Sequence, residues 1–474
     1  MNRLPILIAV VLLIFVLHTH AWESNLFIRR RIFGDARTDS KPSEYERWFT
    51  QNLDHFNPND ERTWQQRYYM NSDYSDGKGN LAFLMIGGEG EETDSWMTNG
   101  SWITYAGKYK PILFDLEHRY YGKSHPTEDL STENLVYLTS QQALADIAFF
   151  IEAMNEQHNL TDNVKWIVFG GSYPGNLAAW VRQKYPHLVH GAVSSSAPLL
   201  AKLNFSEYYN VVVDSLRASN DNCPTIIKES FSQVEALLLT EDGQRNLNKL
   251  FNLCGDITEN VNNSLDMSTF FLRLSSQFAE AAQYNENNSL DTLCNIMLNE
   301  SIGPEINRLA AVYNSTYIEN YCFNYNYDTM IEGPRNISWS SHDRSSRAWT
   351  YQTCTEFGYF QTTSKFPLSY WIQICQDIFS PSYTETFLNH AIKNTNVEYG
   401  GLDIQVSNVV FVHGSLDPWH ALGITTTLNE KVPAILINGT AHCGDMRNPS
   451  DDDSPQLKAA RVKVEELIGT WIDL

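Results

Sequence analysis

Residues 166–180 read Trp-Ile-Val-Phe-Gly-Gly-Ser-Tyr-Pro-Gly-Asn-Leu-Ala-Ala-Trp, which is an apolar run, a glycine turn with a central serine, and a helical pattern. The apolar run does not alternate with polar residues, as is typical of a strand covered on both faces of a parallel sheet. The order strand, tight turn, helix is the context of a nucleophile elbow, in which the turn lifts the side chain of Ser172 above the sheet edge. Pro174 stands where the usual second glycine would be, and its ring fits the first turn of a helix. An ordinary turn serine is the alternative interpretation.

Short apolar runs of the same kind occur toward both ends of the chain. They cover residues 81–86, 111–116, 409–412 and 434–437. Between them, apolar residues recur at helical spacing, as within 140–154 and 457–471. This alternation predicts an α/β fold, in which a doubly wound, mostly parallel sheet carries helices on both faces.

The middle of the chain has a different pattern. From about residue 203 to about residue 345 the sequence is rich in asparagine, and apolar clusters such as 237–239 and 270–274 resemble buried helix faces. We therefore predict that a large helical cap, residues 203–345, interrupts a core made of residues 22–202 and 346–474.

Two further strand ends carry the partners that a nucleophilic serine needs. A hydroxyl needs a base to take its proton, and the base needs a carboxylate to orient it. Asp417 follows the run at 409–412, and His442 follows the run at 434–437. The order serine, aspartate, histidine is that of the α/β-hydrolase triad, and each member would lie at a strand end, where such sheets bind ligands. We therefore predict a triad of Ser172, Asp417 and His442 on an α/β-hydrolase core.

Each partner also has a simpler interpretation. Asp417 precedes Pro418 and could form an ordinary turn, and His442 could be a surface loop histidine. His413 and His420 are rival bases, although we expect His413 within the strand and His420 too close to Asp417 for the usual geometry.

Backbone amides are expected to stabilise the oxyanion that forms during acyl transfer. One donor would be the N–H of Tyr173, which follows the serine. The second would come from the glycine loop 87–90, with Gly88 at its centre, because glycines let the backbone approach a substrate oxygen. Glu89 in that loop would be a fixed anion near the site if it turned into the cleft, although a solvated glutamate is the default.

The first residues have the pattern of a secretory signal peptide. Arg3 is followed by the apolar run 4–17, and Thr19 and Ala21 supply the small residues of a cleavage site. We predict a signal peptide over residues 1–21. A retained signal anchor is the alternative, but the run is shorter than the ~20 residues that span a bilayer, so we expect no stable membrane insertion after cleavage.

The charge of the chain argues against a nucleic-acid partner. Its 474 residues include 34 Lys and Arg and 56 Asp and Glu, which gives a net charge of −22 and a pI near 4.9. This is the wrong sign for holding a phosphate backbone, and it suits an acidic vesicle or the cell exterior.

Sequons and cysteines agree with passage through the secretory pathway. Candidate glycosylation sites are Asn99, Asn159, Asn204, Asn262, Asn287, Asn299, Asn314, Asn336 and Asn438. The cysteines are Cys223, Cys254, Cys294, Cys322, Cys354, Cys375 and Cys443. Their odd number leaves one unpaired, their spacing alone leaves the pairing open, and none has the CxxC form of a zinc site, so we expect no metal and no cofactor.

Several blocks of the chain resemble a known family. It is the family of lysosomal and secreted serine peptidases that contains prolyl carboxypeptidase, dipeptidyl peptidase II and thymus-specific serine protease. The blocks lie at residues 87–90, 117–124, 170–173 and 349–356. Further blocks are most similar to the thymus-specific branch, and they lie at residues 186–188, 195–198, 205–208 and 442–446. The resemblance extends from about residue 48 to about residue 471.

The resemblance implies roles for particular residues. Ser172 would be the nucleophile, Asp417 the orienting carboxylate and His442 the base, and Trp419 would border the pocket for the residue before the cut. It also implies a helical cap, cleavage after proline near a peptide terminus, and an acidic optimum. The implied disulfides are Cys223 to Cys294, Cys254 to Cys322 and Cys354 to Cys375, which leaves Cys443 free.

The sequence thus predicts a secreted or lysosomal serine exopeptidase that acts on peptides. The alternatives are an esterase or lipase on the same triad, and a secreted binding protein with an inactive site. Whether residues leave from the amino or the carboxyl end is open. Glu89 and Glu356 are candidates for recognising a free amine. The oligomeric state is open too, a homodimer included.

Overall fold

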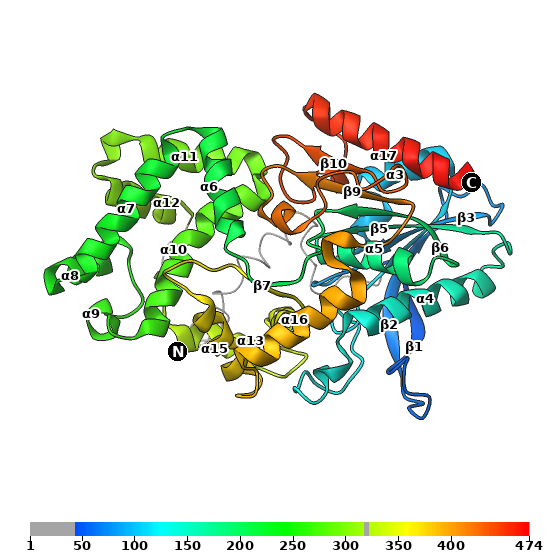
Figure 1. Ribbon diagram of the computed structural model, residues 1–474, viewed down its shortest axis with the longest axis horizontal. Helices are drawn as coiled ribbons and strands as arrows, with labels where there is room; N and C mark the ends of the chain where they lie inside the picture. Colours follow the sequence, from blue (N-terminus) through cyan, green and yellow to red (C-terminus); the bar gives the residue numbers. More distant parts are fainter. Residues whose placement is uncertain (1–42, 317–321, 474) are drawn as a thin grey trace, which may run out of the picture.

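The computed structural model describes residues 43–316 and 322–473. The predicted signal peptide, residues 1–21, lies outside the described residues. Within them the main sheet has eight strands in the order β1-β2-β4-β3-β5-β6-β9-β10 (Figure 1). Their bounds are Glu46–Asn52 (β1), Thr63–Asn71 (β2), Leu81–Ile86 (β3), Ile112–Leu116 (β4), Lys165–Gly171 (β5), Val189–Ser195 (β6), Val409–Gly414 (β9) and Ala434–Ile437 (β10). Only β1–β2 and β2–β4 pair antiparallel. This topology confirms the expected α/β-hydrolase core.

Helices cover both faces of the sheet, because alternate residues of the central strands point to opposite sides. Ala82 and Leu84 of β3 pack with α4 (Ser140–Gln157) and α5 (Tyr173–Lys184). Leu81 and Phe83 of the same strand pack with α3 (Ser101–Tyr109) and α17 (Pro455–Asp473). Two buried faces explain why the strand sequence is continuously apolar.

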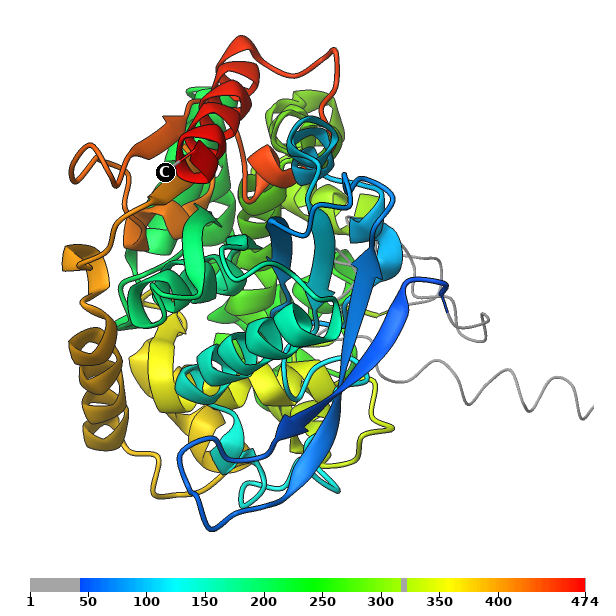
Figure 2. The same cartoon turned by 90° about the vertical axis from the view of Figure 1, so that its right-hand side faces the viewer.

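The long antiparallel pair at one edge contrasts with the covered centre of the sheet. Figure 2 shows β1 and β2 (blue) crossing one side of the molecule, with α17 (red) at the top of the view.

Among the described residues, no helix combines the length and the apolar character that a membrane span requires.

A group of helices lies beside the sheet (green in Figure 1). It contains α6 (Glu207–Ser219), α7 (Cys223–Leu238), α8 (Glu241–Leu250), α9 (Ile257–Asn260), α10 (Ser264–Tyr284), α11 (Ser289–Leu298) and α12 (Glu305–Thr316). We call these helices the cap. They agree with the helical character expected for residues 203–345.

In the described part of the chain, four more α-helices follow the cap before the chain re-enters the sheet at β9, and they lie on both sides of residue 345. They are α13 (Tyr327–Arg335), α14 (Arg344–Gln352), α15 (Leu368–Ile378) and α16 (Glu385–Tyr399). A small parallel pair consists of β7 (Lys202–Asn204) and β8 (Gly358–Phe360). It links the segment just before the cap to the segment between α14 and α15. Tyr399 of α16 stacks on Trp180 of α5 with ring centroids 3.9 Å apart, so α16 packs on the core. The domain boundary at 345 stays a prediction.

Three disulfides are formed, between Cys223 and Cys294, between Cys254 and Cys322, and between Cys354 and Cys375. Cys443 remains a free thiol. This is the pairing that the family resemblance implied. The first bridge joins the start of α7 to α11, and the second joins the segment between α8 and α9 to the segment that precedes α13.

Candidate active site

Ser172 stands in a strained turn between β5 and α5. Its backbone has φ 65° and ψ −133°, a conformation that side chains other than glycine rarely adopt. The turn is close-packed, because a Cβ on Gly170 would lie 2.1 Å from the carbonyl oxygen of Pro174. The N–H of Ser172 donates to the carbonyl of Ser195 at 2.9 Å, which ties the turn to β6. The elbow expected from the sequence is therefore present, with Pro174 in the first turn of α5.

Asp417 and His442 meet at the carboxyl ends of β9 and β10. His442 Nδ1 lies 2.8 Å from Asp417 Oδ2, and both side chains are buried. The carboxylate selects the tautomer with the proton on Nδ1, which leaves Nε2 available as a base. Ser172 and His442 line the same cavity, of about 1290 Å³.

The electrostatics of His442 follow from this pair. Burial by itself lowers the pKa of the imidazole, but the charge of Asp417 and the hydrogen bond to it outweigh burial and raise the pKa well above its usual value. Cys443, the free thiol, acts in the same direction and also lines the cavity. The carboxylate thus stabilises the imidazolium that forms when a base accepts a proton.

The rival histidines are placed differently. His413 lies inside β9, 1% exposed, and burial lowers its pKa to about 4. Its ring packs on the backbone of Gly423, where a Cβ would lie 2.1 Å from Cε1. His420 Nδ1 lies 2.7 Å from the carbonyl oxygen of Asp417. Neither histidine is among the residues that line the cavity.

The glycine loop after β3 packs against the elbow. A Cβ on Gly88 would lie 2.3 Å from Cγ of Pro174, so only glycine fits where the loop meets this ring. Tyr173 is the first residue of α5, where helical N–H groups have no partner within the helix. Glu89 and Gly90 line the cavity, whereas Gly88 does not. Tyr173 and Gly88 as oxyanion donors stay predictions.

A buried ion pair supports the same loop, and sequence reasoning gave it no role. The Arg67 guanidinium pairs with the Glu117 carboxylate at the end of β4. Glu117 Oε2 accepts from the N–H of Glu92 at 3.0 Å, and Arg67 Nη2 donates to the carbonyl of Glu92 at 2.9 Å. Both backbone groups of Glu92 are therefore fixed. A charged residue directly after an apolar strand was the available signal, but it does not say which cation is the partner.

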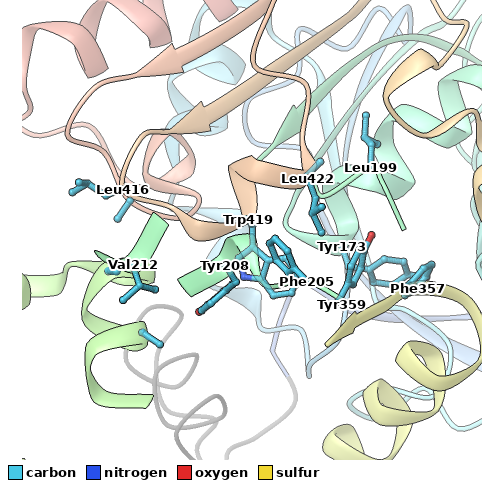
Figure 3. Close-up of a cluster of buried hydrophobic side chains, with 14 of the residues drawn as sticks. Tyr173, Leu199, Phe205, Tyr208, Val212, Phe357, Tyr359, Leu416, Trp419 and Leu422 are labelled. Carbon is cyan, nitrogen blue, oxygen red and sulfur yellow. The ribbon is translucent and has the colours of Figure 1, made fainter. Parts of the chain in front are cut away.

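Aromatic rings form one wall of the cavity around Trp419. Figure 3 shows Trp419 among Phe205, Tyr208 and Tyr359. Its ring centroid lies 5.5 Å from that of Phe205, 5.8 Å from that of Tyr208 and 5.4 Å from that of Tyr359. Trp419, Tyr208 and Tyr359 line the cavity. The last two were not identified from the sequence, because they come from distant segments that only the fold brings together.

The two candidate amine-binding glutamates differ in position. Glu89 lines the cavity, and its role stays a prediction. Glu356 is not among the residues that line the cavity. Its carboxylate accepts from Ser140 N at 2.9 Å and from Ser140 Oγ at 2.7 Å, at the start of α4. Burial raises its pKa to about 7 despite these bonds. The prediction that Glu356 binds substrate is therefore not supported, since the fold uses this carboxylate to hold a helix.

The cap directly contacts the two loops that carry Asp417 and His442, the predicted triad residues. The N–H of His442 donates to the carbonyl of Gln283 near the end of α10 at 2.7 Å. Ser215 of α6 donates from Oγ to the carbonyl of Leu416, the residue before Asp417, at 3.1 Å. The loops that carry His442 and Asp417 are thus fastened to the cap as well as to the sheet.

Comparison with known proteins gives a family match over most of the chain. The family described as serine carboxypeptidase S28 matches residues 51–464. A putative serine protease of Caenorhabditis elegans is 38% identical over 456 residues, which are 90% of this chain and 84% of that protein. The thymus-specific serine protease of Mus musculus is 34% identical over 450 residues, 90% of this chain and 87% of that protein. The lysosomal Pro-X carboxypeptidase of Homo sapiens is 28% identical over 458 residues, 90% of this chain and 88% of that protein.

Proposed function

The chain belongs to the serine carboxypeptidase S28 family and is a serine-type peptidase, and from this premise we propose that Ser172, Asp417 and His442 are its catalytic triad. One observation carries the proposal: the bond between His442 and Asp417 lies at the strand ends that face the cavity of Ser172. Strand ends at one edge of a parallel sheet are where such folds bind ligands.

In the proposed reaction, the Ser172 oxygen attacks the carbonyl carbon of the scissile bond. His442 takes the hydroxyl proton at Nε2 and later gives it to the leaving amine, while Asp417 stabilises the imidazolium. The N–H of Tyr173 and an amide of the loop at Gly88 would hold the oxyanion. In the second half of the reaction, water attacks the acyl carbon while His442 takes a proton from it. His442 then gives this proton to the Ser172 oxygen as the acyl group leaves. No cofactor takes part in this scheme.

We propose that the enzyme cleaves after proline. The aromatic wall around Trp419 offers flat apolar surfaces on which a rigid pyrrolidine ring can pack. A relative named Pro-X carboxypeptidase over 90% of this chain supports the same substrate class. The cavity is bounded by cap residues such as Gln283 and Tyr284, and a bounded cavity favours chain ends over folded proteins. Analysis of the cleavage products shows whether residues are released from the amino or the carboxyl end of the peptide.

We propose that the protein works in the secretory pathway, in a lysosome or outside the cell. Three disulfides need an oxidising compartment to form, and a relative is named lysosomal. The acidic optimum that the family resemblance implied conflicts with the raised pKa of His442, because a protonated imidazole cannot accept a proton. The pH profile of kcat/KM shows whether activity is highest at acidic pH, as the family resemblance implies, or only at higher pH, as the raised pKa of His442 implies. Membership of a peptidase family supports action on peptides. The expectation of no nucleic-acid partner and the open question of a homodimer remain predictions from the sequence.

A fluorophosphonate probe and a set of short peptides test the proposal together. We expect the probe to label Ser172, and Ser172→Ala to abolish labelling and to lower kcat by about 10⁶-fold. Ser232→Ala, on the exposed side of α7, is the matched control and should behave as the parent protein.

The peptides carry proline at the second, penultimate or an internal position, and mass spectrometry identifies the products. Cleavage after proline at one end supports an exopeptidase and shows which end is used. Efficient turnover of acyl esters without peptide cleavage would favour the esterase alternative. Labelling that persists in Ser172→Ala, or no labelling of folded protein at any pH, would contradict the triad.

A further inference from the structure

Two of the predicted glycosylation sites lie at the cavity of Ser172. Every sequon asparagine whose side chain is described is exposed, namely Asn99, Asn159, Asn204, Asn262, Asn287, Asn299, Asn336 and Asn438. Among these, Asn99 and Asn287 line the catalytic cavity. Since an exposed residue that also lines a cavity stands at its edge, both lie at the mouth.

The two asparagines come from different parts of the molecule. Asn99 lies in the core, in the turn before α3, and Asn287 lies in the cap, in the short turn Glu286–Asn288 between α10 and α11. Asn448 Nδ2 donates to Asn99 Oδ1 at 3.1 Å. Arg447, the neighbour of Asn448, pairs with Glu286 at 3.8 Å.

These contacts join one sector of the mouth from the core to the cap. Asn99, Asn448, Arg447, Glu286 and Asn287 all line the cavity, and Arg447 is five residues after His442 in the same loop. We call this set the rim sector. Its two ends carry sequons, so a large group on either end would stand directly over the route to the catalytic loop.

The chemistry of attachment is compatible with the local contacts. The amide nitrogen of the asparagine displaces the diphosphate from C1 of a lipid-linked oligosaccharide and loses one proton, so one N–H remains. Asn99 Nδ2 donates to the carbonyl of Ser95 at 3.0 Å and to Thr98 Oγ1 at 3.1 Å. Loss of one hydrogen still leaves a donor for one of these bonds. Asn287 is exposed, with φ 50° in a turn.

We propose that N-linked glycans on Asn99 and Asn287 screen the rim sector and limit the length of the peptides that reach Ser172. The inference rests on the proposed function, since it assumes hydrolysis in this cavity. An N-linked glycan is bulky and hydrated, so it excludes other chains from the volume it sweeps. A short peptide passes below the sugars, whereas a long one must extend out of the mouth through them.

Asn159 provides a matched control within the same chain. It follows α4 and precedes the amino end of β5, whereas Ser172 follows the carboxyl end of that strand. Asn159 therefore lies at the opposite edge of the sheet from the cavity. A glycan there is as large and as soluble as one on the rim sector, but it cannot cover the mouth.

The experiment compares secreted parent protein with Asn99→Gln, Asn287→Gln, the double variant, and Asn159→Gln. Mass spectrometry of glycopeptides measures occupancy independently of activity, and kcat/KM is measured for short and long peptides that share one cleavage site. We expect both sites to be occupied. The double variant should gain about tenfold in kcat/KM on long peptides, equivalent to about 1.4 kcal/mol, and remain unchanged on short ones. Asn159→Gln should not change either value.

Trimming the glycans of the parent protein with an endoglycosidase serves as the second measurement if a variant fails to fold. It should reproduce the gain on long peptides. Unoccupied rim asparagines, or an unchanged preference for short peptides after their sugars are removed, would overturn the inference while the peptidase activity stands. Failure of every form to cleave short peptides would overturn the proposed function, and this inference with it.

Discussion

Glu356 is a carboxylate whose protonation is linked to the stability of the fold. Its oxygens accept from Ser140 at the start of α4, and burial raises its pKa to about 7. In the unfolded chain a glutamate titrates near pH ~4.3. Between these two values the folded protein keeps a proton that the unfolded chain has lost. Folding is therefore favoured by this group at low pH and loses that contribution as pH rises through the window.

Glu356→Gln should remove this dependence, because an amide keeps an acceptor for Ser140 and does not ionise. We expect the unfolding temperature of the variant, relative to the parent protein, to be higher at pH 8 than at pH 5. Thermal unfolding of both proteins at the two pH values measures the difference. The exposed Glu229→Gln is the control, and it should show no such trend. A constant difference across pH would mean that Glu356 is ionised throughout.

At this scale the sequence predicts residues that follow strands and misses residues that depend on a partner. An apolar run directly precedes each of Ser172, Asp417 and His442. Their positions at strand ends could therefore be predicted from the order of residues along the chain. Glu356 lay in a recognisable block, yet its partner Ser140 is 216 positions away. Spacing along the chain does not say which distant group a buried carboxylate will meet.

Helices α6 and α10 connect the cap to the loops that carry the proposed triad residues Asp417 and His442. Ser215 is buried, and its bond to Leu416 holds the loop that continues into Asp417. A neutral hydrogen bond of this kind contributes about 1 kcal/mol. Losing it should loosen the carboxylate that orients His442 without touching the pocket for substrate.

Ser215→Ala should therefore lower kcat by about fivefold and leave KM nearly unchanged. Steady-state kinetics on a small ester and on a proline peptide give both constants. Ser215→Thr keeps the hydroxyl and should restore much of kcat, and Ser232→Ala on α7 is the control. A variant that loses only thermal stability, with kcat intact, would show that the contact is merely structural.

The sequence predicts strands by their apolar character, so it fails where that character is weak. The buried strands β3, β5 and β9 were found, because both of their faces are covered. β1 was not found, since it lies at the sheet edge and only Gln51 of its residues is fully buried. A strand that leaves most side chains in water has no hydrophobic run to detect.

At the scale of the whole molecule, disulfides hold the cap together. The bridges Cys223–Cys294 and Cys254–Cys322 close loops with sequence separations of 71 and 68. In the loop-entropy account, each such bridge stabilises the folded chain by about 4 kcal/mol. Because α10 accepts from the N–H of His442, a loosened cap should disturb the catalytic loop as well.

The double variant Cys223→Ala with Cys294→Ala should unfold at a lower temperature and lose peptide hydrolysis before the sheet melts. Calorimetry and activity measured along the same temperature ramp test this order. Cys443→Ala leaves all three bridges intact and is the control for unfolding temperature. If the bridge variant keeps full activity up to the melting of the sheet, the coupling of cap and catalytic loop is wrong.

The general arrangement of the molecule follows from its sequence, and its cavity does not. Alternating strand and helix patterns predict the core, and apolar clusters that resemble buried helix faces predict helices in the middle of the chain. The cavity joins Trp419 after β9, Tyr208 of α6 and Tyr359 of β8. Their meeting depends on how the cap docks on the sheet, which is a property of packed surfaces and not of local pattern.

The close approach of Gly88 to the Pro174 ring has one more consequence. The ring acts as a spacer of fixed thickness between the two backbone segments expected to grip a tetrahedral centre, one from each side. The width of that grip can change little, because the pyrrolidine ring is closed onto its own backbone nitrogen and cannot swing away as an open side chain does. Whoever wishes to retune this enzyme for a bulkier acyl group would begin at this spacer, and not at the three residues of the proposed triad.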